Sequence, residues 1–304
     1  MQAEITAKSW LMVAALGLVW GGTFPVIEIA LEEFTPFWLA AGRVVFAGLL
    51  TTAIWIAMGG RLFETRPRPI DVANLILIGA LSTALPFMLI SWGQKYVTAG
   101  FAGVSMASVA LMVLPLAHVL TRDEKMNARK SLGFLIGFVG VVILIGPEAF
   151  RSTGAEGELA GRLACLAAAA CYAISSVTMR PLAPIDAIGL TAVTLLIGAA
   201  IGVPAALAVE GPPPAPSLKG WIVIAILGLI PTAAASLLRV LVIRSAGPTF
   251  MSLTNYQVPL WSVILGVTFL GEPFRWSLLL AMALILAGVA LSQWGALLRL
   301  FCKR

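Results

Sequence analysis

The sequence predicts an all-α integral membrane protein with ten transmembrane helices, arranged as two inverted five-helix repeats with both termini in the cytoplasm. Three observations predict this class: the composition, the placement of the basic residues and an internal repeat. Of the 304 residues, 60% are hydrophobic and 11% are charged, and the mean hydropathy is +0.99. Soluble domains carry about 25% charged residues. The composition therefore excludes a soluble globular protein, a disordered protein and a disulfide-stapled secreted fold.

Ten apolar runs are each close to the length of about 20 residues that a helix needs to cross a bilayer core. Continuous runs of this kind also exclude an outer-membrane barrel, whose strands read as short alternating segments. The predicted spans are 10–30, 37–58, 72–91, 99–120, 131–146, 159–179, 186–209, 220–243, 249–269 and 276–298. Charges, Pro or Gly bound each run, and only a helix satisfies its own backbone groups in hydrocarbon.

The basic residues determine the predicted orientation. When loops are sorted alternately from a cytoplasmic N-terminus, 14 of the 20 Lys and Arg residues fall inside and five fall outside, with Arg43 left within a span. Short cytoplasmic loops are enriched in Lys and Arg. We therefore expect a multi-pass protein of the inner (plasma) membrane, with N-in and C-in topology.

An offset of 148 residues relates the two halves of the chain. It places Glu124 on Glu272, each sixteen residues before a Gly-Val pair, and Pro36 on Pro184. With five spans per repeat, the second copy enters the membrane from the opposite side, which is the architecture of many secondary transporters. The predicted boundaries are residues 1–147 for the first repeat, 148–158 for a connecting loop and 159–304 for the second repeat.

Several motifs occur in an order that resembles a known family. These are Leu18-Val-Trp-Gly-Gly-Thr-Phe-Pro25, Pro36 followed by Arg43, Pro259 thirteen residues before Gly271-Glu272, and Gly288-Val289 behind them. Together they resemble the EamA-type half of the drug/metabolite transporter superfamily, present twice. The first half departs from this pattern, because Leu111 stands where the offset places Pro259. The resemblance implies ten helices, a substrate cavity between the halves, and export or exchange of small metabolites, amino acids or drugs.

Arg43 lies seven residues inside the second span, about 10 Å from its outer end. An Arg at a helix centre costs roughly 2.5–3.5 kcal/mol on insertion scales, so we expect it to face the bundle interior. There it either binds a carboxylate or phosphate of a substrate, or acts structurally by bonding helix ends.

No Asp or Glu lies in the centre of a span, which argues against a proton-driven cation antiporter. We expect Glu28 at a solvated mouth and Glu124 and Glu272 as helix caps.

Other polar and aromatic side chains at membrane depth complete the candidate site. The predicted substrate-binding residues are Trp20, Thr23, Arg43, Ser105, Tyr172, Ser176, Asn255 and Tyr256. The alternative for each is hydrogen bonding between helices, worth about 0.6 kcal/mol on average. The predicted conformational hinges are Pro25, Pro86, Pro231 and Pro259, with static kinks as the alternative. Glycines at 133, 137 and 140 predict close packing of the fifth helix.

The expected function is a secondary carrier that exports or exchanges small amphipathic metabolites, above all amino acids or related carboxylates, by alternating access between the two repeats. An exporter of drugs or organic cations is the first alternative, and a non-transporting scaffold or sensor is the second. The sequence has no metal-ligand spacing, catalytic motif or nucleotide-binding motif, so we expect no enzyme, metal or cofactor. The expected partners are a small-molecule substrate and the lipid bilayer, without nucleic acid, and the sequence does not distinguish a monomer from a homodimer.

Overall fold

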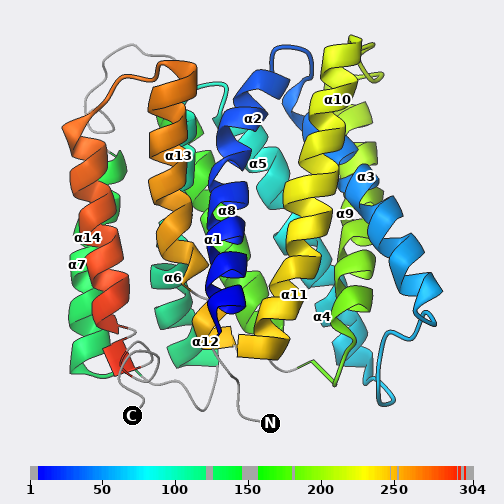
Figure 1. The fold of residues 1–304 in the computed structure, drawn as a ribbon, viewed down its shortest axis with the longest axis horizontal. Coiled ribbons are helices and arrows are strands. Elements are labelled where there is room, and N and C mark those ends of the chain that lie inside the picture. The colour runs from blue at the N-terminus through cyan, green and yellow to red at the C-terminus, as the bar shows by residue number, and fades with distance from the viewer. Residues whose placement is uncertain are drawn as a thin grey trace.

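The computed structural model describes residues 6–120, 126–145, 157–179, 182–246, 248–251, 253–292, 294–295 and 298 as a helical bundle (Figure 1). The helices are α1 Ala7–Gly21, α2 Thr23–Ala30, α3 Pro36–Ala57, α4 Pro69–Gly79, η1 Ala80–Ala84, α5 Leu85–Gly93, α6 Ala99–Leu120, α7 Ala128–Ile145, α8 Glu158–Met179, α9 Ala187–Glu210, α10 Leu218–Leu227, η3 Gly228–Ala234, α11 Ala235–Ala246, α12 Pro248–Met251, α13 Thr254–Leu270 and α14 Trp276–Ser292. Within these ranges, seven helical segments are long and apolar enough to cross a membrane. The all-α membrane class is confirmed.

Every predicted span coincides with one helix or with a stack of two or three. The ninth is divided near its start into two helices, because α12 ends at Met251 and α13 begins at Thr254. The predicted connecting loop 148–158 lies mostly outside the described residues, as does Glu124. Among the described helices, α1 begins and α14 ends at the same end of the bundle (Figure 1).

Three of the four predicted hinge prolines coincide with a departure from regular α-helix. Pro25 follows the junction of α1 and α2 at Gly22. The π-helical segment η1 ends just before Pro86, and η3, also π-helical, contains Pro231. Proline lacks the amide donor of an i→i−4 bond, and its ring clashes with the carbonyl one turn earlier. Pro259 instead lies inside α13, which continues through it as α-helix.

Helices from the two halves pack against each other throughout the bundle. The pairs α3 with α9, α6 with α13 and α7 with α14 join helices that the 148-residue offset relates. The α7–α14 pair lies at the left edge of Figure 1, and glycine explains its close approach. A Cβ atom on Gly140 would lie 2.9 Å from the carbonyl oxygen of Ala281. The predicted close packing of the fifth helix is confirmed.

Carboxylates from the opposite half cap the start of two long helices. Glu210, the last residue of α9, accepts hydrogen bonds from the hydroxyl of Thr35 (2.5 Å) and the amides of Phe37 and Trp38 (both 3.1 Å) at the start of α3. Glu272 accepts from the amides of Ala99 (2.5 Å) and Gly100 (3.1 Å) at the start of α6. The predicted capping role is confirmed for Glu272.

The same side of the bundle carries further bonds between the halves. Glu33 accepts from the amide (2.7 Å) and the hydroxyl (2.8 Å) of Ser217, the N-cap of α10. These hydrogen bonds hold the pKa of Glu33 below its ordinary value of 4.5. Glu32 pairs with Lys219 at 2.9 Å.

Backbone hydrogen bonds join the halves at the other membrane surface. The amide of Glu64 donates to the carbonyl of Pro184 (3.0 Å), and the amide of Asp186 donates to the carbonyl of Leu62 (2.9 Å). An isolated antiparallel bridge between Phe63 and Ile185 lies between these two bonds. The α3–α9 pair is therefore fastened at both surfaces.

Replacing Glu210 with Ala is expected to lower the free energy of unfolding by about 1–3 kcal/mol, because three donors at the start of α3 lose their acceptor. Thermal unfolding in detergent micelles measures this loss. Glu64→Ala is the control, since the Glu64 side chain is exposed. Equal melting temperatures for the two variants would contradict the capping role.

Candidate functional site

The candidate site is built around Arg43, which lies where the two halves meet at membrane depth. Arg43 belongs to α3 and is 5% exposed. Its Nε and Nη2 atoms donate to the hydroxyl oxygen of Thr232, at 3.3 and 3.1 Å, on η3 of the other half. Its guanidinium carbon lies 4.1 Å from the centre of the Phe87 ring on α5. Arg43 has no carboxylate within ion-pair distance among the described residues.

The π-helical segment η3 provides hydrogen-bond acceptors for the side chains of this site. In a π-helix the hydrogen bonds run from i to i+5, and such segments are frequent at functional sites. The Thr232 hydroxyl donates to the carbonyl of Leu227, five residues earlier, at 2.8 Å. This bond leaves the oxygen lone pairs of Thr232 directed at Arg43. The adjacent carbonyl of Pro231 accepts from the indole of Trp20 at 3.0 Å.

The structure thus brings together three of the predicted binding residues. Trp20 and Arg43 contact neighbouring residues of η3, and Tyr172 of α8 is near enough to Arg43 for an electrostatic interaction. Trp20 and Tyr172 are both partly buried against the main core cluster. Arg43 and Trp20 therefore meet at η3 between the halves, and Tyr172 lies within electrostatic range of Arg43.

Three other predicted residues bond to carbonyls one turn earlier in the chain, Ser105 and Ser176 within their own helices and Thr23 across the α1–α2 junction. The hydroxyls of Thr23, Ser105 and Ser176 donate to the carbonyls of Val19 (2.9 Å), Ala102 (2.7 Å) and Tyr172 (2.7 Å). Thr23 and Ser105 are buried, and Ser176 is exposed. Each hydroxyl has its donor satisfied within three or four residues, so none needs a partner on another helix.

The remaining two predicted residues lie at the start of α13. Asn255 is exposed, and the neighbouring Gln257 packs on Gly17 of α1. The two amides therefore point in different directions. The hydroxyl of Tyr256 is buried without a hydrogen-bond partner in the described part of the chain. Buried polar groups are normally bonded, so this hydroxyl is available to a ligand or a water molecule.

Glu28 does not lie at a fully solvated mouth. It is half-buried, one of its carboxylate oxygens is buried without a partner among the described residues, and it lies beside Glu272 and the first amide of α6. Glu28 thus lies beside the start of α6, which Glu272 caps.

Sequence reasoning missed two members of the site, Thr232 and Phe87. A threonine after a proline and a phenylalanine in an apolar helix carry no signal that separates them from ordinary membrane-facing residues. Only the packing of α3 against η3 and α5 shows that both contact Arg43.

The model of the EamA-like transporter family matches residues 7–146 and again residues 159–294. The chain belongs to the EamA-like transporter family. Among its relatives, the "Uncharacterized inner membrane transporter YedA" of Escherichia coli (strain K12) is 27% identical over 284 residues, which cover 92% of this chain and 89% of that protein. The chain is a multi-pass transporter of the inner membrane.

Other comparisons agree with this family. The "Probable terminal-alkyne amino-acid exporter" of Streptantibioticus cattleyicolor is 27% identical over 154 residues, half of each chain. A solved structure described as "Crystal structure of protein" superposes with a TM-score of 0.65 at 21% identity, covering 95% of this chain and 98% of the other. This last likeness concerns the fold alone.

Thr232→Val is expected to destabilise the EamA-like chain by about 1.5–3 kcal/mol, because a buried cation loses its acceptor. The control is Thr83→Val, at the other π-helical segment, where the hydroxyl donates to the carbonyls of Gly79 (2.6 Å) and Thr194 (3.2 Å). Neutral bonds of that kind contribute about 1 kcal/mol. Thermal unfolding of both variants measures the difference, and equal losses would contradict a special role for the Arg43–Thr232 bond.

Proposed function

We propose that this transporter exports or exchanges small amphipathic carboxylates, above all amino acids, by alternating access. Arg43 would bind the carboxylate, while Trp20, Tyr172 and Tyr256 would contact the apolar part of the solute. Thr23, Ser105, Ser176 and Asn255 would line the path. The amino-acid exporter among the relatives supports the same substrate class.

The observation that carries this proposal is the burial of Arg43 without a carboxylate. Its described contacts are a neutral hydroxyl and the face of an aromatic ring. Neither contact neutralises its charge. A guanidinium presents five donors in a planar fork that matches a carboxylate. An anionic solute would neutralise the positive charge of Arg43 at the junction of the two halves.

We further propose two inverted five-helix repeats, residues 1–147 and 159–304, joined by 148–158, with both termini in the cytoplasm. The family model matches twice, and the offset that relates the repeats places Ala80 of η1 on Gly228 of η3. Contacts between corresponding helices, such as α3 with α9, are what a two-fold relation produces.

The prolines fit a role as hinges in this scheme. Segments η1 and η3 each pack on the second helix of the opposite repeat, α9 and α3 respectively. Bending at Pro25, Pro86, Pro231 and Pro259 would change which end of the cavity is open. The α3–α9 pair is fastened at both surfaces and would serve as the pivot.

Counterflow in proteoliposomes tests the substrate class. Leucine, an organic acid and an amphipathic amine are compared as labelled solutes in wild type, Arg43→Ala, Arg43→Lys and the surface control Arg275→Ala. Carboxylate flux is expected to fall about tenfold or more in Arg43→Ala, because a charge-assisted bond contributes roughly 1.5–3 kcal/mol. Arg43→Lys retains the charge and keeps part of the flux, and Arg275→Ala matches wild type.

Two outcomes contradict the proposal. Movement of the amine alone identifies an organic-cation exporter. Carboxylate flux that is unchanged in a folded Arg43→Ala protein identifies Arg43 as a structural residue.

A further inference from the structure

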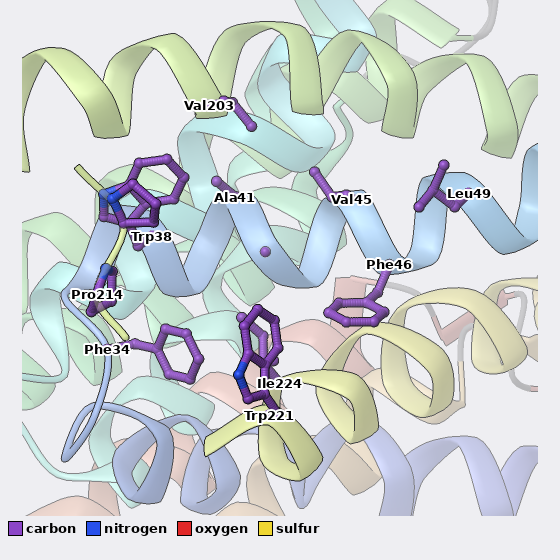
Figure 2. Close-up of a pocket in the computed structure, with 12 residues that line it drawn as sticks. Phe34, Trp38, Ala41, Val45, Phe46, Leu49, Val203, Pro214, Trp221 and Ile224 are labelled. Carbon is purple, nitrogen blue, oxygen red and sulfur yellow. The ribbon is translucent and has the colours of Figure 1, made fainter. Parts of the chain in front are cut away.

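A cavity of about 310 Å³ runs along α3 on the surface of the bundle, between α9 and α10 (Figure 2). We call it the α3 groove. Trp38, Val45 and Leu49 line it from α3, and Trp221 and Ile224 line it from α10. Every lining side chain is apolar or aromatic. The indole N–H of Trp38 donates to the carbonyl of Gly211 at 3.0 Å, so it does not offer a polar contact inside the groove.

The α3 groove is separate from the Arg43 site. Its floor is closed at Gly42, where a Cβ atom would meet the side chain of Ile224, and Ile224 itself is 2% exposed. Leu49 and Trp221, by contrast, are 65% and 51% exposed. The groove therefore opens sideways, toward the space that lipid occupies around a membrane protein.

The length of the groove matches one leaflet of a bilayer. Trp38 and Leu49 are eleven residues apart on α3, which corresponds to about 16 Å. Half of a hydrocarbon core is about 15 Å. The groove begins beside Pro213 and Pro214, in the connection between α9 and α10, and Figure 2 shows Trp38 and Pro214 together at that end. Tryptophans at this level are typical of the membrane–water interface.

We propose that the α3 groove binds one acyl chain of a phospholipid from the leaflet on the side of the α2–α3 and α9–α10 connections. The apolar walls of the groove favour a hydrocarbon chain. The length of the groove matches the thickness of one leaflet, so it fits a chain that extends from the headgroup level to the bilayer midplane. A transmembrane helix of a second protein would need a surface of about 30 Å, twice the length available. In the proposed topology this leaflet is the outer one.

The bound chain would lie beside a hinge. Phe46 lines the groove and also packs against Gly228, the first residue of η3. An acyl chain in the groove therefore fills the space beside the junction of α3 with the π-helical segment that holds Thr232.

Photocrosslinking tests the site in the full chain. The protein is reconstituted with phosphatidylglycerol that carries a diazirine on one acyl chain, and labelled peptides are identified by mass spectrometry. Label is expected to concentrate on α3 and α10 around Val45 and Trp221. Val45→Trp fills the groove and should cause a several-fold loss of this label. Val142→Trp is the matched control, because Val142 is an exposed valine of α7, far from α3.

Ala41→Leu is a second, smaller filling variant, and the melting temperature of each variant shows that it is folded. Label spread over all lipid-facing helices, or label on α3 that is unchanged in both folded filling variants, overturns the proposal. Displacement of the label by excess leucine also overturns it, because the groove would then be a solute site.

Discussion

The structure depends on a constraint that lipid imposes on helix ends. The first amides of a helix have no partner within the helix, and near hydrocarbon they must find one elsewhere. Here carboxylates from the opposite half supply it, with Glu210 at the start of α3 and Glu272 at the start of α6. Because each cap crosses between the halves, the requirement of one helix end for an acceptor also fastens the two halves together.

The same rule makes Arg43 unusual. An Arg at a helix centre costs roughly 2.5–3.5 kcal/mol, and a hydrogen bond to a charged group returns about 1.5–3 kcal/mol. The free energy contributed by the bonds to Thr232 and by the Phe87 ring is similar to this cost. The two contacts together can therefore hold the cation in the bundle. They leave its positive charge uncompensated, which is why an anionic solute fits the site electrostatically.

The candidate residues divide by side-chain chemistry. Ser and Thr hydroxyls reach a carbonyl one turn earlier in the chain, and Thr23, Ser105 and Ser176 do so. Arg43, Trp20 and Tyr256 are too long or too rigid for that bond. Trp20 and Arg43 find partners across the bundle, whereas the Tyr256 hydroxyl has none among the described residues. Side-chain length thus separates polar groups that are hydrogen-bonded locally from those that need a partner elsewhere in the bundle.

Composition and hydropathy can be read along the chain without tertiary structure, and they were enough to predict the helical class and ten spans. The recurrence of Glu124 and Glu272 under the 148-residue offset indicated the capping role of Glu272. Proline positions indicated where Pro25, Pro86 and Pro231 interrupt regular helix, since the missing amide acts within one turn. The residues that contact Arg43 could not be predicted in this way. Thr232 and Phe87 are 189 and 44 positions away in the chain, and an apolar helix presents many equivalent faces to its neighbours. Only the packing of α3 against η3 and α5 determines which of these side chains meets the buried cation.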